Sequence, residues 1–558
     1  MMIIYRNKII TQSSFFRAVI VPAFLSILLG NVAIAQDRTV PGELSSPYPT
    51  VTNLAVEWLI NGDDNLNGVV QVKYRSKGSA AWKEAMPLRR IPAGYNNTAL
   101  KHPTKVAGYN GFGWKNKHSG SIFDLQPGTA YEIKLSLKDP DGGKAEKTIQ
   151  ARTRPIPVYS KNARIIDIAP GVYDTLYTES GTEKRPVVYR CSKGEAVFRF
   201  IEARERKWVF LEQLTVKNPA AKGTGIRLTG AENCVVQYCT IRATYGIIAY
   251  YPGAINCYIS DNTVSADFEW SNEAMGAQGK NIGEGIQLTG SGNVICYNRV
   301  AGYRDCISFM EDWEVLSQVC NDIYNNDVEG GLDDGIEADF AFSNCRIMRN
   351  RLTNCYVGVS SQPGLGGPTY IVRNVMYNVV HSAFKLKRES RGDVVLHNTV
   401  IKSGAGLAGN DTMDHAYFRN NLAFGGPNGG INWGGYGAGQ PFAANIISPG
   451  KHSSFDYDAV GVYNTPYMAL IGDRPFSEVE KNGIERLDFK LTFPGIEFPY
   501  PPVPLRKPPV LKVAEGARSE DAGILIPNIN DQFSGKAPDC GAYEAGQPVP
   551  HYGPRIKN

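Results

Sequence analysis

A short element of the form apolar–x–x–Asn–x–apolar recurs through the middle of this 558-residue chain. Ile259 to Val264 is one copy. Repetition at a step of about 24 residues is typical of solenoids, in which each repeat forms one coil stacked on its neighbours. Asparagines stacked at one corner can satisfy one another's buried amide groups. The residues assigned to this position are Cys239, Asn262, Asn298, Asn326, Asn350, Asn374, Asn398 and Asn420.

A second element recurs in step with the first and consists of a small residue followed by an apolar one, as in Gly285-Ile286 and Gly335-Ile336. Its apolar residues are mostly β-branched, which favours strands over helices. Alternate side chains of such strands point inward and outward. We therefore predict an all-β protein with a right-handed parallel β-helix over residues 160–450.

Residues 46–155 form a module of their own, in which short apolar stretches such as Leu54 to Trp58 alternate with turn signals. This pattern predicts a small β-sandwich. The segment from Leu125 to Tyr131 resembles the tyrosine corner of fibronectin type III domains, with Trp58 as the core tryptophan. We expect a fibronectin type III-like domain here. The long aromatic loop within 90–118 could either bind sugar or pack against the next domain.

The two ends of the chain carry their own signals. Residues 1–35 combine basic residues, an apolar run from Ala18 to Leu29 and an Ala-x-Ala cleavage site ending at Ala35, which predicts a signal peptide. We expect an exported protein, either secreted or periplasmic. From 451 to 558 the repeat is lost, and the tail resembles the closing segment of many secreted bacterial β-helix proteins. An open helix end needs covering, so we predict a cap.

The composition limits the partners. The net charge of +5 is spread along the chain and permits an anionic substrate. No basic aromatic patch points to nucleic acid, and no apolar run after the signal peptide is long enough for a membrane span. We expect a monomer. Nine of the ten cysteines lie between Cys191 and Cys355 without a CxxC pair, so we interpret most as small buried fillers.

The stretch Leu332 to Asp339 places four carboxylates within seven residues. Aligning the coils on the Gly-Ile element puts Glu284, Asp305 and Asp334 in one column at a turn, at a spacing of about 4.8 Å. Glu337 and Asp339 point outward beside this column. Like charges opposite each other destabilise a sheet, so we predict either a bound cation or carboxyls with raised pKa. Both are signs of a functional site.

A basic group follows the acidic one in the same outward columns. Lys385 and Lys387 are expected two coils further on, with Gln362 and Arg373 between the two halves. The predicted catalytic residues are Lys385, Lys387, Asp305, Asp334 and Glu337. The predicted substrate-binding residues are Glu284, Asp339, Gln362, Arg373, Arg388 and Arg391.

Asp333-Asp334-Gly335-Ile336-Glu337 resembles the calcium-binding motif of family-nine pectate lyases, which are parallel β-helix enzymes. The resemblance implies calcium as cofactor and a lysine base, either Lys385 or Lys387. Glu337 stands where the family has aspartate, and neither lysine lies one coil after the motif. The metal ligands that the resemblance implies are Asp305, Asp333, Asp334 and Glu337.

Three functions fit these residues. The first is calcium-assisted β-elimination on a uronic-acid polysaccharide, with a lysine whose pKa is lowered by nearby cations as the base. The second is hydrolysis, with Asp305 and Glu337 as the carboxyl pair and Asp334 tuning one of them. The third is a non-catalytic carbohydrate-binding or adhesin protein, which predicts neutral and aromatic outward columns. Elimination is the primary hypothesis.

Overall fold

A computed structural model describes residues 36–96, 112–309, 318–407, 409–427, 444–450 and 452–557. The predicted signal peptide lies outside the described residues. The described part consists almost entirely of strands, with two four-residue helices, α1 (Phe476–Val479) and α2 (Phe489–Thr492). None of the helices in these ranges is long and apolar enough to cross a membrane.

The N-terminal domain is a seven-stranded antiparallel structure in the order β1-β2-β7-β4-β3-β8-β9. Its core holds Trp58, which is fully buried. The hydroxyl of Tyr131 accepts a hydrogen bond from the Gln126 amide at 2.9 Å, which is the contact expected of a tyrosine corner. The strands are β1 (Val40–Ser45), β2 (Leu54–Asn61), β3 (Val69–Ser76), β4 (Lys83–Ile91), β7 (Lys117–Ile122), β8 (Ala130–Lys138) and β9 (Lys144–Arg152), with a separate pair β5 (Gly94–Asn96) and β6 (Phe112–Trp114).

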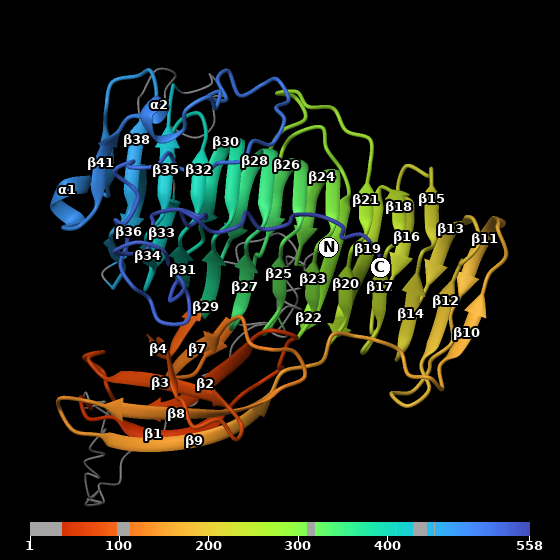
Figure 1. The fold of residues 1–558 in the computed structure, drawn as a ribbon, viewed down its shortest axis with the longest axis horizontal. Helices are drawn as coiled ribbons and strands as arrows, with labels where there is room; N and C mark the ends of the chain where they lie inside the picture. The colour runs from red at the N-terminus through yellow and green to blue at the C-terminus, as the bar shows by residue number, and fades with distance from the viewer. Residues whose placement is uncertain are drawn as a thin grey trace, which may run out of the picture.

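The strands from β10 to β41 form a parallel β-helix, seen as two rows of strands in Figure 1. Its first sheet contains β10 (Arg164–Asp167), β12 (Val187–Arg190), β14 (Val209–Glu212), β17 (Val235–Gln237), β20 (Tyr258–Ser260), β23 (Val294–Cys296), β25 (Asp322–Tyr324), β27 (Cys345–Met348), β29 (Leu365–Val372), β31 (Ser390–Leu396), β33 (Gly409–Asp414), β34 (Tyr417–Arg419), β36 (Ala444–Pro449), β37 (Ser454–Asp456), β39 (Ala469–Ile471) and β40 (Arg474–Pro475).

The second sheet contains β11 (Gly171–Tyr177), β13 (Ala196–Glu202), β15 (Thr215–Asn218), β16 (Thr224–Arg227), β18 (Thr240–Ala243), β19 (Tyr245–Ile255), β21 (Thr263–Ser265), β22 (Glu284–Ser291), β24 (Arg299–Ser308), β26 (Asp327–Glu337), β28 (Arg351–Ser361), β30 (Val375–Leu386), β32 (Thr399–Ile401), β35 (Leu422–Gly425), β38 (Ala459–Val462) and β41 (Ile484–Leu487). The predicted parallel β-helix is confirmed.

The long strands of the second sheet bend in the middle, where their register shifts. In β24 the shift lies between Tyr303 and Asp305, and β26 and β28 shift at matching places. Each bend divides the sheet into two faces. The N-terminal halves of these strands form what we call the second face. Their C-terminal halves, such as residues 305–308, form what we call the site face. The first sheet is the first face.

The asparagine ladder holds neighbouring coils in register. The side-chain amide of Asn326 donates to Asn350 Oδ1 and to the Ile295 carbonyl, both at 3.0 Å. Equivalent bonds run from Asn262 to Asn398, as the sequence predicts. The residue before each ladder position has a positive φ, which turns its side chain outward. Residues at that preceding position are Tyr238, Asp261, Tyr297, Asn325, Arg349, Arg373, His397 and Asn420.

The assignment of Asn420 to the ladder is wrong. Asn398 donates instead to Asn421 Oδ1, at 3.0 and 2.9 Å. Asn420, with φ +60°, points outward and donates to the Ile524 carbonyl. Two adjacent asparagines make the repeat spacing compatible with either residue, so only the backbone conformation distinguishes them.

The β-helix also continues past the predicted end at 450. β38 pairs with β35, and β41 pairs with β38, so the stack reaches Leu487. The ladder continues from Asn421 to Asp458 across 37 residues, a step long enough to hide the repeat. Here Asp458 Oδ1 accepts from Asn421, and Glu480 Oε2 accepts from the Asp458 amide at 2.9 Å.

Part of the tail predicted as a cap, 451–558, does lie at the helix end, where Phe476 of α1 packs into the apolar cluster inside the β-helix. The remainder of the tail covers a different surface. After α2 it returns along the side of the β-helix and ends beside β17 and β20 (Figure 1). Arg555 pairs with Asp261 at 2.7 Å, and Lys557 pairs with Glu212 at 3.1 Å. Aromatic residues of this segment, such as Phe489, pack on side chains of the second face. The tail therefore covers the second face.

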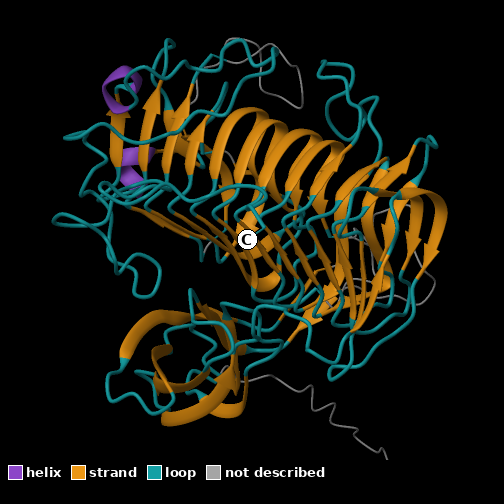
Figure 2. Ribbon diagram, turned by 45° about the vertical axis from the view of Figure 1, so that its right-hand side comes forward, coloured by secondary structure: helices purple, strands orange, loops and turns teal. Residues whose placement is uncertain are grey.

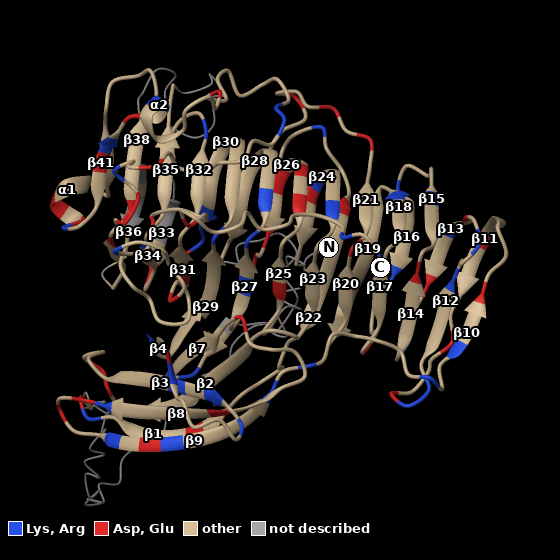
Figure 3. Ribbon diagram, viewed as in Figure 1, with Lys and Arg blue, Asp and Glu red and all other residues tan. Residues whose placement is uncertain are grey.

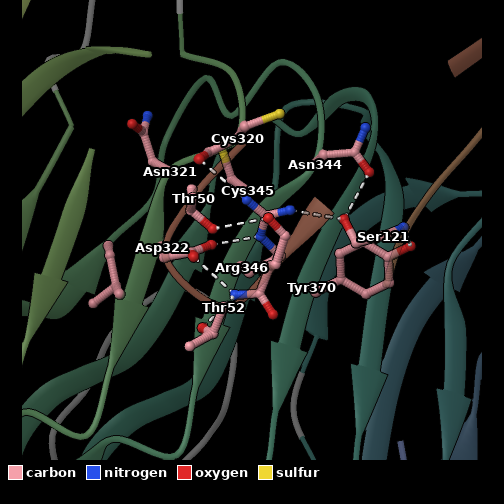
Figure 4. Close-up of polar contacts among 12 residues, drawn as sticks. Thr50, Thr52, Ser121, Cys320, Asn321, Asp322, Asn344, Cys345, Arg346 and Tyr370 are labelled. Carbon is pink, nitrogen blue, oxygen red and sulfur yellow. Dashed lines mark hydrogen bonds and ion pairs between the residues drawn. The ribbon is translucent and has the colours of Figure 1, made fainter. Parts of the chain in front are cut away.

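The N-terminal domain packs against the first face (Figures 1 and 2). At the centre of the contact lies Arg346, which is fully buried, pairs with Asp322 and donates to Ser121 Oγ at 3.1 Å (Figure 4). Asn53 donates to the other oxygen of Asp322 at 2.8 Å. The Tyr370 hydroxyl accepts from the Ser121 amide. A buried network of this kind fixes the two domains relative to each other.

All ten cysteines are buried and free, which confirms their interpretation as small core fillers. Most of them lie in the large apolar cluster inside the β-helix.

The end of the ladder generates a pH-dependent prediction. Burial raises the pKa of Asp458 to about 6, above an unfolded value of about 3.9. Its contribution to stability is therefore present at low pH and is lost as the pH rises through about 6. We expect Asp458→Asn to raise the free energy of unfolding at pH 8, on the order of 1 to 3 kcal/mol, and to change it little at pH 4. Urea denaturation at both values measures this, and an equal change at both would contradict it.

Candidate active site

The acidic column forms where the sequence places it. Glu284 pairs with Asp305, and Asp305 pairs with Asp334, across three successive strands of the site face. One carboxylate oxygen each from Asp305, Asp333 and Asp334 lie within 4.8 Å of one another. The same holds for Glu284, Asp305 and Glu337. The predicted column of Glu284, Asp305 and Asp334, with Glu337 beside it, is confirmed, and Asp333, which the register left unplaced, joins it.

This arrangement differs from the other charged stack of the second sheet. On the second face, Asp327 lies between Arg299 and Arg351, with ion-pair distances of 2.6 and 2.9 Å. The alternating blue and red bands on β24, β26 and β28 in Figure 3 show this pattern. Stacked charges of opposite sign stabilise neighbouring strands, whereas three stacked carboxylates require compensation. The repulsion among the stacked carboxylates of the site face therefore lowers the stability of the fold.

Asp305 is the centre of the cluster. Its side chain is almost fully buried, and Oδ1 accepts the Asp334 amide at 2.9 Å. Burial raises the pKa of Asp305 well above its usual range, and the charges of Glu284, Asp334 and Asp333 raise it further. The Arg304 guanidinium opposes this shift. This shift favours the protonated carboxyl, which is the form that can donate a proton.

Lys385 reaches the acidic column from two coils further on. It follows Glu337 and Ser360 in the register, and its ammonium forms an ion pair with Asp334. Burial lowers the pKa of Lys385, but Asp334 and the other nearby acids outweigh it and hold the pKa well above its ordinary value. The expectation that neighbouring cations lower this pKa is wrong for Lys385. Its surroundings make it a fixed positive charge.

Asp339 and Gln362 lie side by side beyond the column. The Gln362 amide donates to Asp339 Oδ1 at 2.9 Å, and its side-chain amide donates to Oδ2 at 3.2 Å. Ser360 Oγ also donates to Oδ1. Asp339 is thus held by three hydrogen bonds, and it fixes the start of the glycine-rich loop that follows Gln362.

A second column, which the sequence analysis missed as a column, precedes the acidic one by one residue. It consists of Arg304, Asp333, Tyr356 and His381. Arg304 lies 3.4 Å from both Asp305 and Asp333, and Tyr356 stacks on His381 with 5.0 Å between ring centroids. The same alignment that located Asp334 contains these positions, so the signal was present in the sequence.

His381 is a neutral member of this column. Burial lowers its pKa to about 3, and the positive charges of Lys387, Lys402 and Lys385 act in the same direction. Its Nδ1 lies 2.8 Å from Ser382 Oγ. A neutral imidazole beside the cluster can exchange hydrogen bonds without adding charge.

Arg373 is the predicted site residue that the structure places elsewhere. It occupies the outward position before ladder residue Asn374, with φ +55°, and donates to the Ala542 carbonyl at 3.3 Å. It therefore faces the C-terminal tail and not the site face. The expected position between the acidic and basic halves ignored the left-handed turn that separates the first face from the second.

Lys387, Arg388 and Arg391 follow Lys385 at the corner between the site face and the first face. All three side chains are half-buried. Arg391 pairs in register with Leu365, and its guanidinium lies 5.9 Å from the centre of the Trp114 ring. The three predicted cations thus lie within five residues of one another in the chain, directly after the strand that carries Lys385.

The donor set of the acidic cluster suits a hard divalent cation. All its ligand atoms are carboxylate oxygens, which calcium prefers, and each group of three is compact. Asp305, Asp333, Asp334 and Glu337, the ligands that the family-nine resemblance implies, all belong to these groups. The residues present fit calcium, and the ion would neutralise carboxylate charge beyond that balanced by Lys385 and Arg304.

No protein-family model and no curated protein sequence matches this chain. Among solved structures, the chain is similar to the family 28 exopolygalacturonase of Yersinia enterocolitica. The two are 10% identical with a TM-score of 0.35, and the match covers 80% of this chain and 99% of that one. The fold assigned above rests on the strand pairing.

The buried ion pair generates a prediction. Replacing Lys385 with Gln leaves Asp334 without its cation, so we expect a loss of about 3 to 5 kcal/mol in the free energy of unfolding at pH 7. The loss should shrink at pH 5, because protonation relieves the uncompensated carboxylates. Urea denaturation of Lys385→Gln measures it. The matched control is Lys207→Gln, which removes an exposed ion pair with Glu232 and should cost less than about 1 kcal/mol.

A loss that is the same at both pH values, or no larger than that of the control, would show that Lys385 does not balance the acidic column.

Proposed function

We propose that the protein is an enzyme that cleaves glycosidic bonds in a polysaccharide, and that the site face carries its active site. The observation that carries this proposal is the compact carboxylate cluster around Asp305, with Lys385 paired to Asp334. Strained, same-sign clusters of this kind are typical of functional sites. The columns run along the stack of coils, and an extended polymer could lie along them.

Hydrolysis is the chemistry that these contacts support best. Asp305, whose protonated form is favoured by burial and by its neighbours, would give a proton to the glycosidic oxygen. Glu337, whose nearest oxygen lies within 4.8 Å of one from Asp305, would act as the second carboxylate. Lys385 would keep Asp334 ionised beside the pair. Ser308 Oγ donates to Glu284 at 2.6 Å and would hold that carboxylate in place.

Calcium-assisted elimination is the second candidate, favoured by the two compact groups of carboxylate oxygens. Bound calcium would supply charge stabilisation for a substrate carboxylate. Asp305, Asp333, Asp334 and Glu337 would hold the ion, and Lys385 or Lys387 would take the proton. The ion pair between Lys385 and Asp334 argues against Lys385 as that base, because it favours the protonated form. This places elimination behind hydrolysis.

A purely binding function fits less well. It predicts neutral and aromatic outward columns, whereas the columns around Asp334 are strongly charged. The charged columns around the cluster support a catalytic role better than a carbohydrate-binding role.

The hydrolytic proposal predicts new reducing ends, without the absorbance of unsaturated products, when the full chain acts on a panel of uronic-acid and neutral polysaccharides. Asp305→Asn and Glu337→Gln should each lower the rate at least about 100-fold, because each removes an acid–base partner. Asp267→Asn, which removes an exposed carboxylate paired with Arg242, should leave the rate unchanged. Full activity of Asp305→Asn would remove this site from consideration.

The elimination alternative makes a different prediction. If calcium is needed, a chelator should abolish cleavage, and unsaturated products should appear once calcium is returned. Calcium should also raise the thermal unfolding midpoint of the parent chain and not that of Asp333→Asn, because binding to the folded state stabilises it. Chelator-resistant cleavage, with no calcium effect on unfolding, would eliminate this alternative.

A further inference from the structure

The corner after Lys385 has an unusual backbone. Within five residues it carries Lys387, Arg388 and Arg391, and both Arg388 and Glu389 have positive φ, at 56° and 59°. Two successive residues other than glycine in the left-handed region cost on the order of 1 kcal/mol each or more. Such conformations persist only where the surroundings impose them, and they cluster at functional sites. The question is what holds this corner.

The N-terminal domain holds it from one side. Asn96, which is almost fully buried, donates its side-chain amide to the Arg388 carbonyl at 2.9 Å. The bond joins residues 292 positions apart in the chain. It fixes the peptide between the two strained residues, so the strained turn depends on a side chain from another domain.

Trp114 also contacts the residues of this corner. The Arg391 guanidinium lies over its ring at 5.9 Å, and the indole nitrogen donates to the Pro92 carbonyl at 2.9 Å. The indole also packs against Gly366 so closely that a Cβ there would lie 2.6 Å from Nε1. Only glycine at 366 permits this approach. The ring is therefore fixed, and the Arg391 guanidinium lies within cation–π distance of it.

The same indole reaches the acidic half of the site. Trp114 and Ile91 form one apolar cluster with Phe340 and Leu365. Phe340 directly follows Asp339, and Leu365 begins β29, three residues after Gln362. One side chain of the N-terminal domain thus supports both the hydrogen-bonded pair Asp339–Gln362 and the cationic corner.

We propose that the N-terminal domain completes the substrate site, and that Asn96 and Trp114 are positioning residues for a subsite formed by Lys387, Arg388 and Arg391 that binds the carboxylate of an acidic sugar. Guanidinium and ammonium groups form charge-assisted hydrogen bonds with carboxylates, and a restrained cation loses less entropy on binding. The inference deepens the proposed function by naming the substrate class, an acidic polysaccharide.

Binding can be measured separately from cleavage. The full chain with Asp305→Asn, which keeps the oxygen that accepts the Asp334 amide, is tested by affinity electrophoresis in gels containing polygalacturonate, alginate or hyaluronan, and methyl-esterified polygalacturonate as the uncharged polymer. We expect retardation by at least one acidic polymer, weakened by salt. Asn96→Ala and Trp114→Ala should each weaken this binding about tenfold, which corresponds to about 1.4 kcal/mol. Neither variant should change the response to the uncharged polymer.

Matched controls come from the same domain. Asn67→Ala removes an exposed asparagine bonded to Asp141, and Trp82→Ala removes a tryptophan packed on Arg75. Both should bind within twofold of the parent. Trp114→Phe keeps an aromatic ring under Arg391 and should retain part of the binding, which separates positioning from loss of the fold. Thermal unfolding of each variant accompanies the measurement.

The outcomes separate this inference from the proposed function. Loss of acidic-polymer binding in Asn96→Ala and Trp114→Ala supports the inference even if the parent chain cleaves nothing. Cleavage of an acidic polymer with unchanged binding in both variants overturns the inference and leaves the proposed function standing. Equal losses for charged and uncharged polymers, or a parent that binds none of the acidic polymers, also overturn it.

Discussion

The site depends on the hydrogen-bonded asparagine ladder, because the ladder fixes the register of successive coils. Each ladder amide, such as that of Asn350, donates to the neighbouring coil and accepts from the other side, so no coil can slip without leaving buried amides unsatisfied. A slip of one residue would turn the outward columns into the core. With the register fixed, the column of Glu284, Asp305 and Asp334 follows directly. The asparagine ladder, which has a structural role, thereby also aligns the acidic residues of the site face.

The column is tolerated because its charge is compensated. The raised pKa of Asp305 favours its protonated form, Arg304 lies beside Asp305 and Asp333, and Lys385 reaches back across two coils to Asp334. The stack of Arg299, Asp327 and Arg351 on the neighbouring face shows what the same fold does when only stability matters, since there the signs alternate. The contrast between the two stacks is the physical basis for assigning function to the site face. It also explains why a cation or a positively charged corner belongs next to the cluster.

The other two faces are occupied by segments from the two ends of the chain. The N-terminal domain packs on the first face through the network around Arg346, and the C-terminal tail packs on the second face through aromatic residues such as Phe489. In the described part of the chain, the two segments pack chiefly on the first and second faces. The acidic and basic columns lie on the third, the site face. At the corner beyond Lys385 the N-terminal domain still reaches the site through Asn96 and Trp114. Residues of the N-terminal domain thus contact the proposed subsite directly.

The sequence by itself determined the parallel β-helix, the register and the acidic column, because the period of the coils and the alternation of strand side chains are local properties of the chain. It also located Lys385 in the correct column. Only the tertiary structure decided the direction of the Lys385 pKa shift, the outward position of Arg373 and the choice of Asn421 over Asn420. These three outcomes depend on which charges lie nearby in space and on single backbone angles. The spacing of residues in the repeat does not encode either. The part played by Asn96 rests on a contact between residues 292 positions apart, and no periodicity in the chain reports such a contact.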